Sequence, residues 1–129
     1  MITLIMKYFF LSLLLVTLTD CAQNKRLVLG KENATEELKI ALSKKPQHNV
    51  IDYKKLIIKD SVTAIKIAQP ILFDIYGKEN IEKQKPFEIY LLENYWVISG
   101  TLPEDYLGGT FLIIIDARNS QIIKITHGK

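Results

Sequence analysis

Hydrophobic and polar residues follow three different patterns along the 129 residues of this chain. Residues 8–18 are almost continuously apolar, whereas apolar residues recur every three or four positions in much of the segment from residue 35 to residue 76. After Gly77, apolar and polar residues alternate and turn-forming residues arrive at short intervals. A repeat of 3.6 residues indicates helices and a repeat of two indicates strands. The sequence therefore predicts an α+β fold in which helices precede an antiparallel sheet.

Two helices are predicted before Gly77. The first spans residues 35–44, because acidic residues in its first turn precede apolar residues at helical spacing, and a proline follows its end. The second begins where Asp60 or Ser61 can cap the free backbone amides. Its apolar face consists of Ile65, Ala68, Leu72, Ile75 and Tyr76. Pro70 lies inside this second helix, so we expect a kink there.

About four strands are predicted after the helices. Residues 87–92 and 95–101 alternate in polarity on either side of a tight turn at Glu93 and Asn94, which indicates a hairpin. Residues 111–115 form a continuous apolar run, typical of a central strand covered on both faces, and residues 121–126 form the last strand. We expect an antiparallel sheet with the kinked helix lying across one of its faces.

The amino-terminal segment has the layout of a secretory signal. Lys7 precedes the short apolar run, and polar residues follow it. Met6 stands directly before this lysine, so the true start is predicted at Met6 or at Met1. A membrane-spanning helix is the alternative, and it would need about 20 apolar residues. We interpret residues 1–20 as a signal peptide, residues 21–33 as a tether and residues 34–129 as a single α+β domain.

The only cysteine lies where the apolar run ends. Leu18, Thr19, Asp20 and Cys21 resemble the lipobox of bacterial lipoproteins, although Asp20 replaces the usual small residue. This resemblance implies that Cys21 is lipidated and holds the protein on a membrane of the bacterial cell envelope, facing the periplasm or the exterior. A secreted protein with an unmodified cysteine is the alternative.

Composition excludes several classes of site. A single Cys allows neither an internal disulfide nor a cysteine zinc cluster. The net charge of +3 is spread along the chain without a basic stripe, so no nucleic-acid partner is expected. His48 and His127 lie outside any nucleophile or base motif, and Gly108 and Gly109 lack the lysine of a phosphate loop. We predict a protein that is not an enzyme and that has no cofactor and no metal site.

The predicted hairpin and the loop that follows it carry the candidate partner-binding residues. Tyrosine and tryptophan side chains are enriched in protein interfaces, and a loop presents its side chains outward. Trp96 alternates with Ile98 along its strand, so it has a second possible role in the core. The candidates are Glu104, Asp105, Tyr106, Tyr90, Tyr95 and Trp96.

Short motifs in the second half of the chain resemble those of bacterial immunity proteins with a nuclear transport factor 2 type fold, which occur in polymorphic toxin systems. The motifs are Tyr76 Gly77 Lys78, Lys85 Pro86 Phe87, Tyr95 Trp96 Val97, Gly100 Thr101 Leu102 Pro103, Gly108 Gly109 and His127 Gly128 Lys129. The resemblance covers about residues 60–129 and departs from the pattern at Pro70 and at Ser120, where a turn glycine is expected. The resemblance implies a curved antiparallel sheet wrapped around helices, a cystatin-like or nuclear transport factor 2-like cone. It also implies a protein that neutralises a cognate toxin by covering it.

Two other functions remain open. A member of the same fold can bind a small ligand or act as a catalyst, and this alternative requires a cavity lined by histidine or by paired carboxylates. An envelope lipoprotein with an inhibitory or structural role is the other, because a fold does not determine a function.

Overall fold

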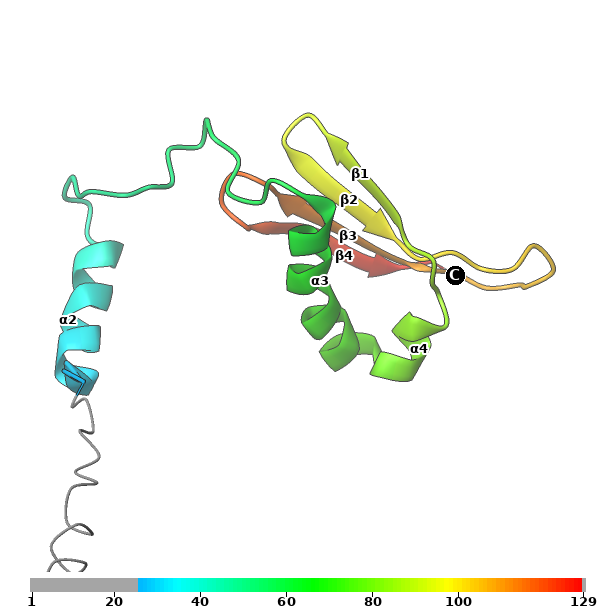
Figure 1. The fold of residues 1–129 in the computed structure, drawn as a ribbon, viewed down its shortest axis with the longest axis horizontal. Coiled ribbons are helices and arrows are strands. Elements are labelled where there is room, and N and C mark those ends of the chain that lie inside the picture. Colours follow the sequence, from blue (N-terminus) through cyan, green and yellow to red (C-terminus); the bar gives the residue numbers. More distant parts are fainter. Residues whose placement is uncertain (1–25, 129) are drawn as a thin grey trace, which may run out of the picture. The chain divides into compact units, whose positions relative to one another are not determined.

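The computed structural model describes residues 26–128, so the predicted signal peptide and Cys21 lie outside the described residues. The chain divides between Gln47 and His48 into two compact units. Figure 1 labels the helices and strands of both units.

The first unit contains one described helix, α2 (Gly30–Leu42). It begins earlier than the predicted residue 35, and the hydroxyl of Thr35 donates to the carbonyl of Lys31 within the helix. The side-chain amide of Gln47 donates to the carbonyls of Ile40 and Ala41 and so satisfies the end of the helix. Helix α2 therefore begins inside the predicted tether, and the division into tether and domain stays a prediction.

The second unit opens with α3 (Ser61–Tyr76), which confirms the second predicted helix. Asp60 caps it, because its carboxylate accepts hydrogen bonds from the backbone N–H and the hydroxyl of Thr63, both at 2.9 Å. The helix continues through Pro70 to Gly77, whose φ of 85° suits glycine. A further short helix, α4 (Lys78–Glu82), follows directly and is absent from the sequence prediction.

Four antiparallel strands complete the second unit, in the order of the sequence. They are β1 (Glu88–Leu92), β2 (Tyr95–Ser99), β3 (Phe111–Asp116) and β4 (Ile122–His127). Leu92 pairs with Tyr95, so the predicted turn at Glu93 and Asn94 is confirmed. The pairing of β3 with β4 shifts between Ile114 and Ile115, which marks a bulge in the sheet.

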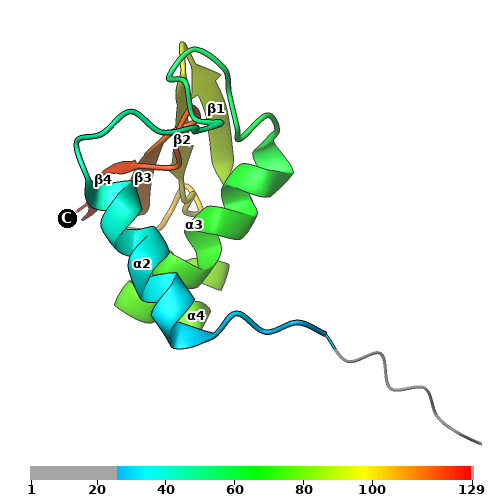
Figure 2. The ribbon, with the colours of Figure 1, turned by 90° about the vertical axis from the view of Figure 1, so that its left-hand side faces the viewer.

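The core lies between the sheet and α3. Small residues at intervals of four, Ala64 and Ala68, let the helix approach the strands closely, and Leu72 continues the same buried face. Figures 1 and 2 show α3 and α4 on the same side of the sheet. The buried residues of the strands and their flanks are Trp96, Ile98, Phe111, Ile113, Ile115 and Ala117.

The segment before α3 is fastened to the sheet by its backbone. The N–H groups of Ile57 and Ile58 donate to the carbonyl of Ala117 at 2.8 and 2.9 Å. The indole of Trp96 donates to the carbonyl of Ile58 at 2.9 Å, which satisfies the polar atom of a buried ring. These contacts hold Ile58 in the core at 1% exposure.

Only one face of the sheet is covered within the second unit. The outward side chains of β3, Leu112 and Ile114, are half-buried, whereas those facing α3 are buried. The prediction that residues 111–115 form a strand is confirmed, but its outer face has no helix of this unit over it. The apolar run therefore supplies both a core and an exposed sheet face.

Candidate functional site

The structure separates the six predicted interface residues into three places. Tyr90 and Tyr95 lie on the outer face of the sheet near the β1–β2 turn. Glu104, Asp105 and Tyr106 lie on the loop at the opposite end of β2, between β2 and β3. Trp96 is only 6% exposed and faces α3, so it has the core role that its alternation with Ile98 indicates. No single site gathers all six.

The outer face of the sheet carries an apolar patch, which we call the outer-face patch. Exposed fractions of 53% for Tyr90, 56% for Leu92 and 49% for Ile123 are unusual for side chains this apolar on a regular sheet. The face is hollowed by a shallow groove of about 350 Å³. The patch consists of Tyr90, Leu92, Tyr95, Val97, Ile114 and Ile123. Two charged residues adjoin it: Glu93 lines the same groove, and Lys124 pairs with Ile114.

An ion pair fixes one edge of this patch. A terminal nitrogen of Arg118 lies 2.7 Å from Oδ2 of Asp116 and also donates to the hydroxyl of Tyr95 at 3.1 Å. The hydrogen bonds from Arg118 hold the pKa of the Asp116 carboxyl below its usual value, and the carboxylate raises the pKa of Arg118. Asp116 is only 4% exposed, whereas the Arg118 side chain is half-buried, and the hydrogen bond from Arg118 orients the Tyr95 hydroxyl.

The loop between β2 and β3 presents apolar side chains to solvent. The N–H of Tyr106 donates to the carbonyl of Pro103 at 2.9 Å, which closes a turn around Glu104 and Asp105. Leu107 is 99% exposed and Tyr106 is 68% exposed. The Leu107 side chain therefore has no packing role in the second unit. Large apolar side chains exposed in this way are typical of a binding loop.

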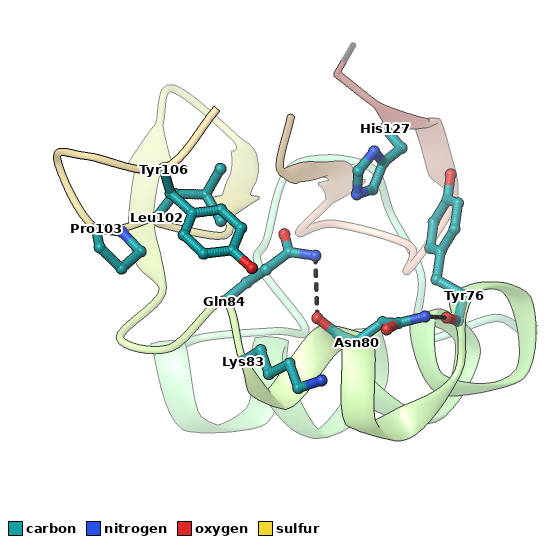
Figure 3. Close-up of a pocket in the computed structure, with 8 residues that line it drawn as sticks. All are labelled: Tyr76, Asn80, Lys83, Gln84, Leu102, Pro103, Tyr106 and His127. Atoms are coloured by element: carbon teal, nitrogen blue, oxygen red, sulfur yellow. Dashed lines mark hydrogen bonds between the residues drawn. The ribbon is translucent and has the colours of Figure 1, made fainter. Parts of the chain in front are cut away.

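A pocket of about 770 Å³ lies beside this loop. Figure 3 shows Tyr106, Leu102 and Pro103 on one side of it, and His127 and Tyr76 on the other. The lining residues come from the end of α3, from α4, from the β2–β3 loop and from the end of β4, and they are Tyr76, Asn80, Lys83, Gln84, Leu102, Pro103, Tyr106 and His127.

Gln84 forms the fixed wall of the pocket. Its amide nitrogen donates to the carbonyl of Asn80 at 3.2 Å, and its amide oxygen accepts from the N–H of Phe111 at 2.8 Å. Its backbone carbonyl accepts from the N–H of Thr101 at 2.8 Å. These bonds join α4 to the ends of β2 and β3 and position the pocket between them. Gln84 has no sequence motif that would have identified this role.

His127 is the last residue of β4, one residue beyond the predicted end of this strand, and it also lines the pocket. It pairs with Phe111 in the sheet, and its ring lies 5.4 Å from that of Tyr76. Its Nδ1 lies 2.9 Å from the carbonyl oxygen of Gly128. A carbonyl only accepts, so Nδ1 carries a proton in this contact, and Nε2 is directed into the pocket (Figure 3).

The pocket has basic and polar side chains but no carboxylate among its lining residues. Lys83 lies at its rim, where its ammonium pairs with Glu79 at 3.0 Å. Within residues 26–128, no group of three or more His, Cys, Asp or Glu side chains is placed to hold a metal ion.

Comparisons with known proteins agree with the motif series. Two Escherichia coli (strain K12) proteins are similar to this chain, "Uncharacterized protein YhhH" at 34% identity over 74 residues and "Uncharacterized protein YbbC" at 33% over 76 residues. The matches cover 57% and 58% of this chain, and 58% and 62% of the relatives, so the chain spans less than two thirds of their length. No solved structure matches.

The family described as "NTF2 fold immunity protein" matches residues 63–129, which include α3 from its third residue onward, α4 and all four strands. This range confirms the expected fold class, a helical segment followed by a curved four-stranded antiparallel sheet. The chain belongs to the NTF2 fold immunity protein family.

Proposed function

We propose that this protein neutralises a cognate toxin by binding it directly. The family match to residues 63–129 carries this proposal, because the match covers most of the second unit. The role is a binding role and not an enzymatic one. Within this proposal the toxin is a protein, and the immunity protein covers the surface through which the toxin acts.

Two surfaces of the second unit are suited to a protein partner. The outer-face patch offers tyrosine and aliphatic side chains on a rigid sheet, and such residues dominate the energetics of interfaces. The β2–β3 loop offers Tyr106 and Leu107 beside the acidic pair Glu104 and Asp105. We propose the outer-face patch as the main contact, because its strands hold it in place before the partner arrives.

Co-expression tests neutralisation. The toxin gene that neighbours this gene is expressed alone and together with the full-length chain, and survival is counted. Survival should be restored only when both are present, and a pull-down should recover a complex. Unchanged killing together with no recovered complex would contradict the proposal.

We also propose that the protein acts from the cell envelope. The proposal depends on the sequence of residues 1–21, in which an apolar run ends at the single cysteine. Within residues 26–128, no helix has both the length and the hydrophobicity that crossing a bilayer requires. A lipid on Cys21 would supply the anchor.

Metabolic labelling with palmitate tests the anchor. The wild-type chain should be labelled and recovered with membranes, whereas Cys21→Ala should lose both the label and the membrane association. Equal absence of label in the two proteins would show that Cys21 is not lipidated.

A ligand-binding role is the second candidate, because the structure contains the kind of cavity that it requires. The pocket is lined by His127, although no paired carboxylates line it. A pocket of this volume lies within the range of small-molecule sites, about 300–1,000 Å³. This observation favours binding over catalysis within that alternative, since a single imidazole has no acidic partner in the lining.

A further inference from the structure

The pocket beside the β2–β3 loop is lined by hydrogen-bond donors and by no carboxylate. Lys83 contributes an ammonium group, and Tyr76 and Tyr106 contribute hydroxyls. None of the eight lining residues is an Asp or a Glu. This imbalance suits a ligand rich in acceptors.

The remaining walls are apolar. Leu102 and Pro103 lie on the loop side of the cavity, and the rings of Tyr76 and Tyr106 face each other across it (Figure 3). Gln84 is hydrogen-bonded to the surrounding backbone and so forms the fixed wall described above. A ligand that fits this lining has an apolar body and a negatively charged end.

We propose that this pocket binds a carboxylate carried on an apolar body, with Lys83 as its charge partner. The carboxylate has two possible sources, a free organic acid or an acidic side chain of a bound protein. The second source rests on the function proposed above, whereas the first is independent of it.

The ammonium of Lys83 already forms an ion pair with the carboxylate of Glu79. A ligand carboxylate must therefore replace Glu79 to reach Lys83. The two side chains are 69% and 83% exposed, respectively, for Lys83 and Glu79. Ion pairs that are this exposed contribute little to stability because water screens them. A ligand carboxylate that enters the pocket can therefore replace Glu79 as the partner of Lys83 at little cost in free energy.

Matched acid and amide probes test the charge requirement. Phenylacetate and phenylacetamide have nearly the same shape, as do the peptides acetyl-Phe-Glu-amide and acetyl-Phe-Gln-amide. Each is titrated into the full-length chain labelled with ¹⁵N, and amide shifts around Asn80 and His127 are followed. We expect the acids to bind with dissociation constants on the order of 1 mM and about fivefold more tightly than the amides.

Three variants locate the charge partner. Lys83→Gln should bring each acid and its amide to within about twofold of each other, because the ammonium is gone. Glu79→Gln should tighten binding of the acids, since it removes the competing carboxylate. Lys124→Gln makes the same charge change on an exposed lysine of β4 and should leave the acid preference intact.

The outcomes separate the two sources and the two proposals. Tighter binding of the acidic peptide points to a protein segment, and tighter binding of phenylacetate points to a free acid. Equal affinity for acids and amides, absence of binding by all four probes, or an acid preference that survives Lys83→Gln would overturn the inference. The titrations need no toxin, so a failure of neutralisation and a failure of this inference are seen separately.

Discussion

Ser120 adopts a backbone conformation that costs free energy for any residue with a side chain. Its φ is 64°, and its N–H donates to the carbonyl of Asp116 at 2.9 Å to close the β3–β4 turn. The family resemblance led us to expect a turn glycine at this place, and the positive φ is a backbone conformation that favours glycine. A residue with a Cβ is strained here, and only glycine avoids the strain.

Replacing this serine with glycine should therefore stabilise the protein. Ser120→Gly should raise the free energy of unfolding by about 0.5–1 kcal/mol, because the relief of strain exceeds the added flexibility of the unfolded chain. Urea denaturation measures the change. Ser120→Ala is the control, since alanine keeps the Cβ, and a similar gain in both variants would show that the backbone conformation is not the cause.

The ion pair of Asp116 and Arg118 predicts how stability depends on pH. Asp116 accepts three hydrogen bonds from Arg118, at 2.9, 2.9 and 2.7 Å, and its pKa lies below the ordinary value of 3.8. A carboxyl whose folded pKa is lowered stabilises the fold above its unfolded pKa and loses that contribution as the pH falls through the folded pKa. This pair therefore contributes at neutral pH and is lost in acid.

Asp116→Asn should lower stability at neutral pH and should flatten the loss of stability on acidification. Unfolding free energies of wild type and variant, measured near neutrality and at about pH 3, should converge at the lower pH. Asp105→Asn, which removes an exposed loop acid, should keep the wild-type slope. A constant difference between Asp116→Asn and wild type at both pH values would assign the effect to packing.

At the scale of elements, two glycines stand where neighbouring segments of the second unit approach each other closely. A Cβ on Gly100 would lie 2.3 Å from the side-chain oxygen of Gln84, and a Cβ on Gly109 would lie 1.8 Å from the carbonyl oxygen of Gly128. The N–H of Gly128 donates to the carbonyl of Thr110 at 2.9 Å. The start of β3 and the end of β4 thus approach each other so closely that no side chain fits between them.

Adjacent glycines in the β2–β3 loop provide a matched test of this contact. Gly109→Ala should lower the free energy of unfolding by about 1–3 kcal/mol, because either strand end must move. Gly108→Ala should change it by less than about 0.5 kcal/mol, since its nearest neighbour would be a methyl group of Leu102 at 3.7 Å. Thermal or urea unfolding measures both, and equal effects would contradict the packing argument.

The elements that the sequence predicted well are those with local signals. The cap at Asp60, the end of α3 at Gly77 and the turn at Glu93 each depend on a few neighbouring residues. Helix α4 has only five residues, which is too short for a helical repeat to be recognised. The pocket has no local signal, because its lining residues come from four separate segments.

At the scale of the whole second unit, the two faces of β3 have different roles, which the periodicity of its apolar run could not reveal. Continuous hydrophobic residues are typical of strands covered on both faces. Here α3 covers the inner face, whereas Ile114 faces outward with Val97 beside it. Both faces are apolar for different reasons, since one forms the core and the other forms the outer-face patch.

A charge placed in the outer-face patch should therefore weaken toxin binding without unfolding the protein. Leu92→Glu should reduce affinity for the toxin at least about tenfold, the effect of losing about 1.4 kcal/mol at an interface, because a carboxylate would be buried against an apolar partner surface. Val62→Glu is the matched control, since Val62 on α3 is 58% exposed, close to the 56% of Leu92. Affinity is measured by titration with purified toxin, and unfolding is measured in parallel. If Leu92→Glu binds as tightly as Val62→Glu and both remain folded, the toxin contacts another surface, and Leu107→Ala then tests the β2–β3 loop.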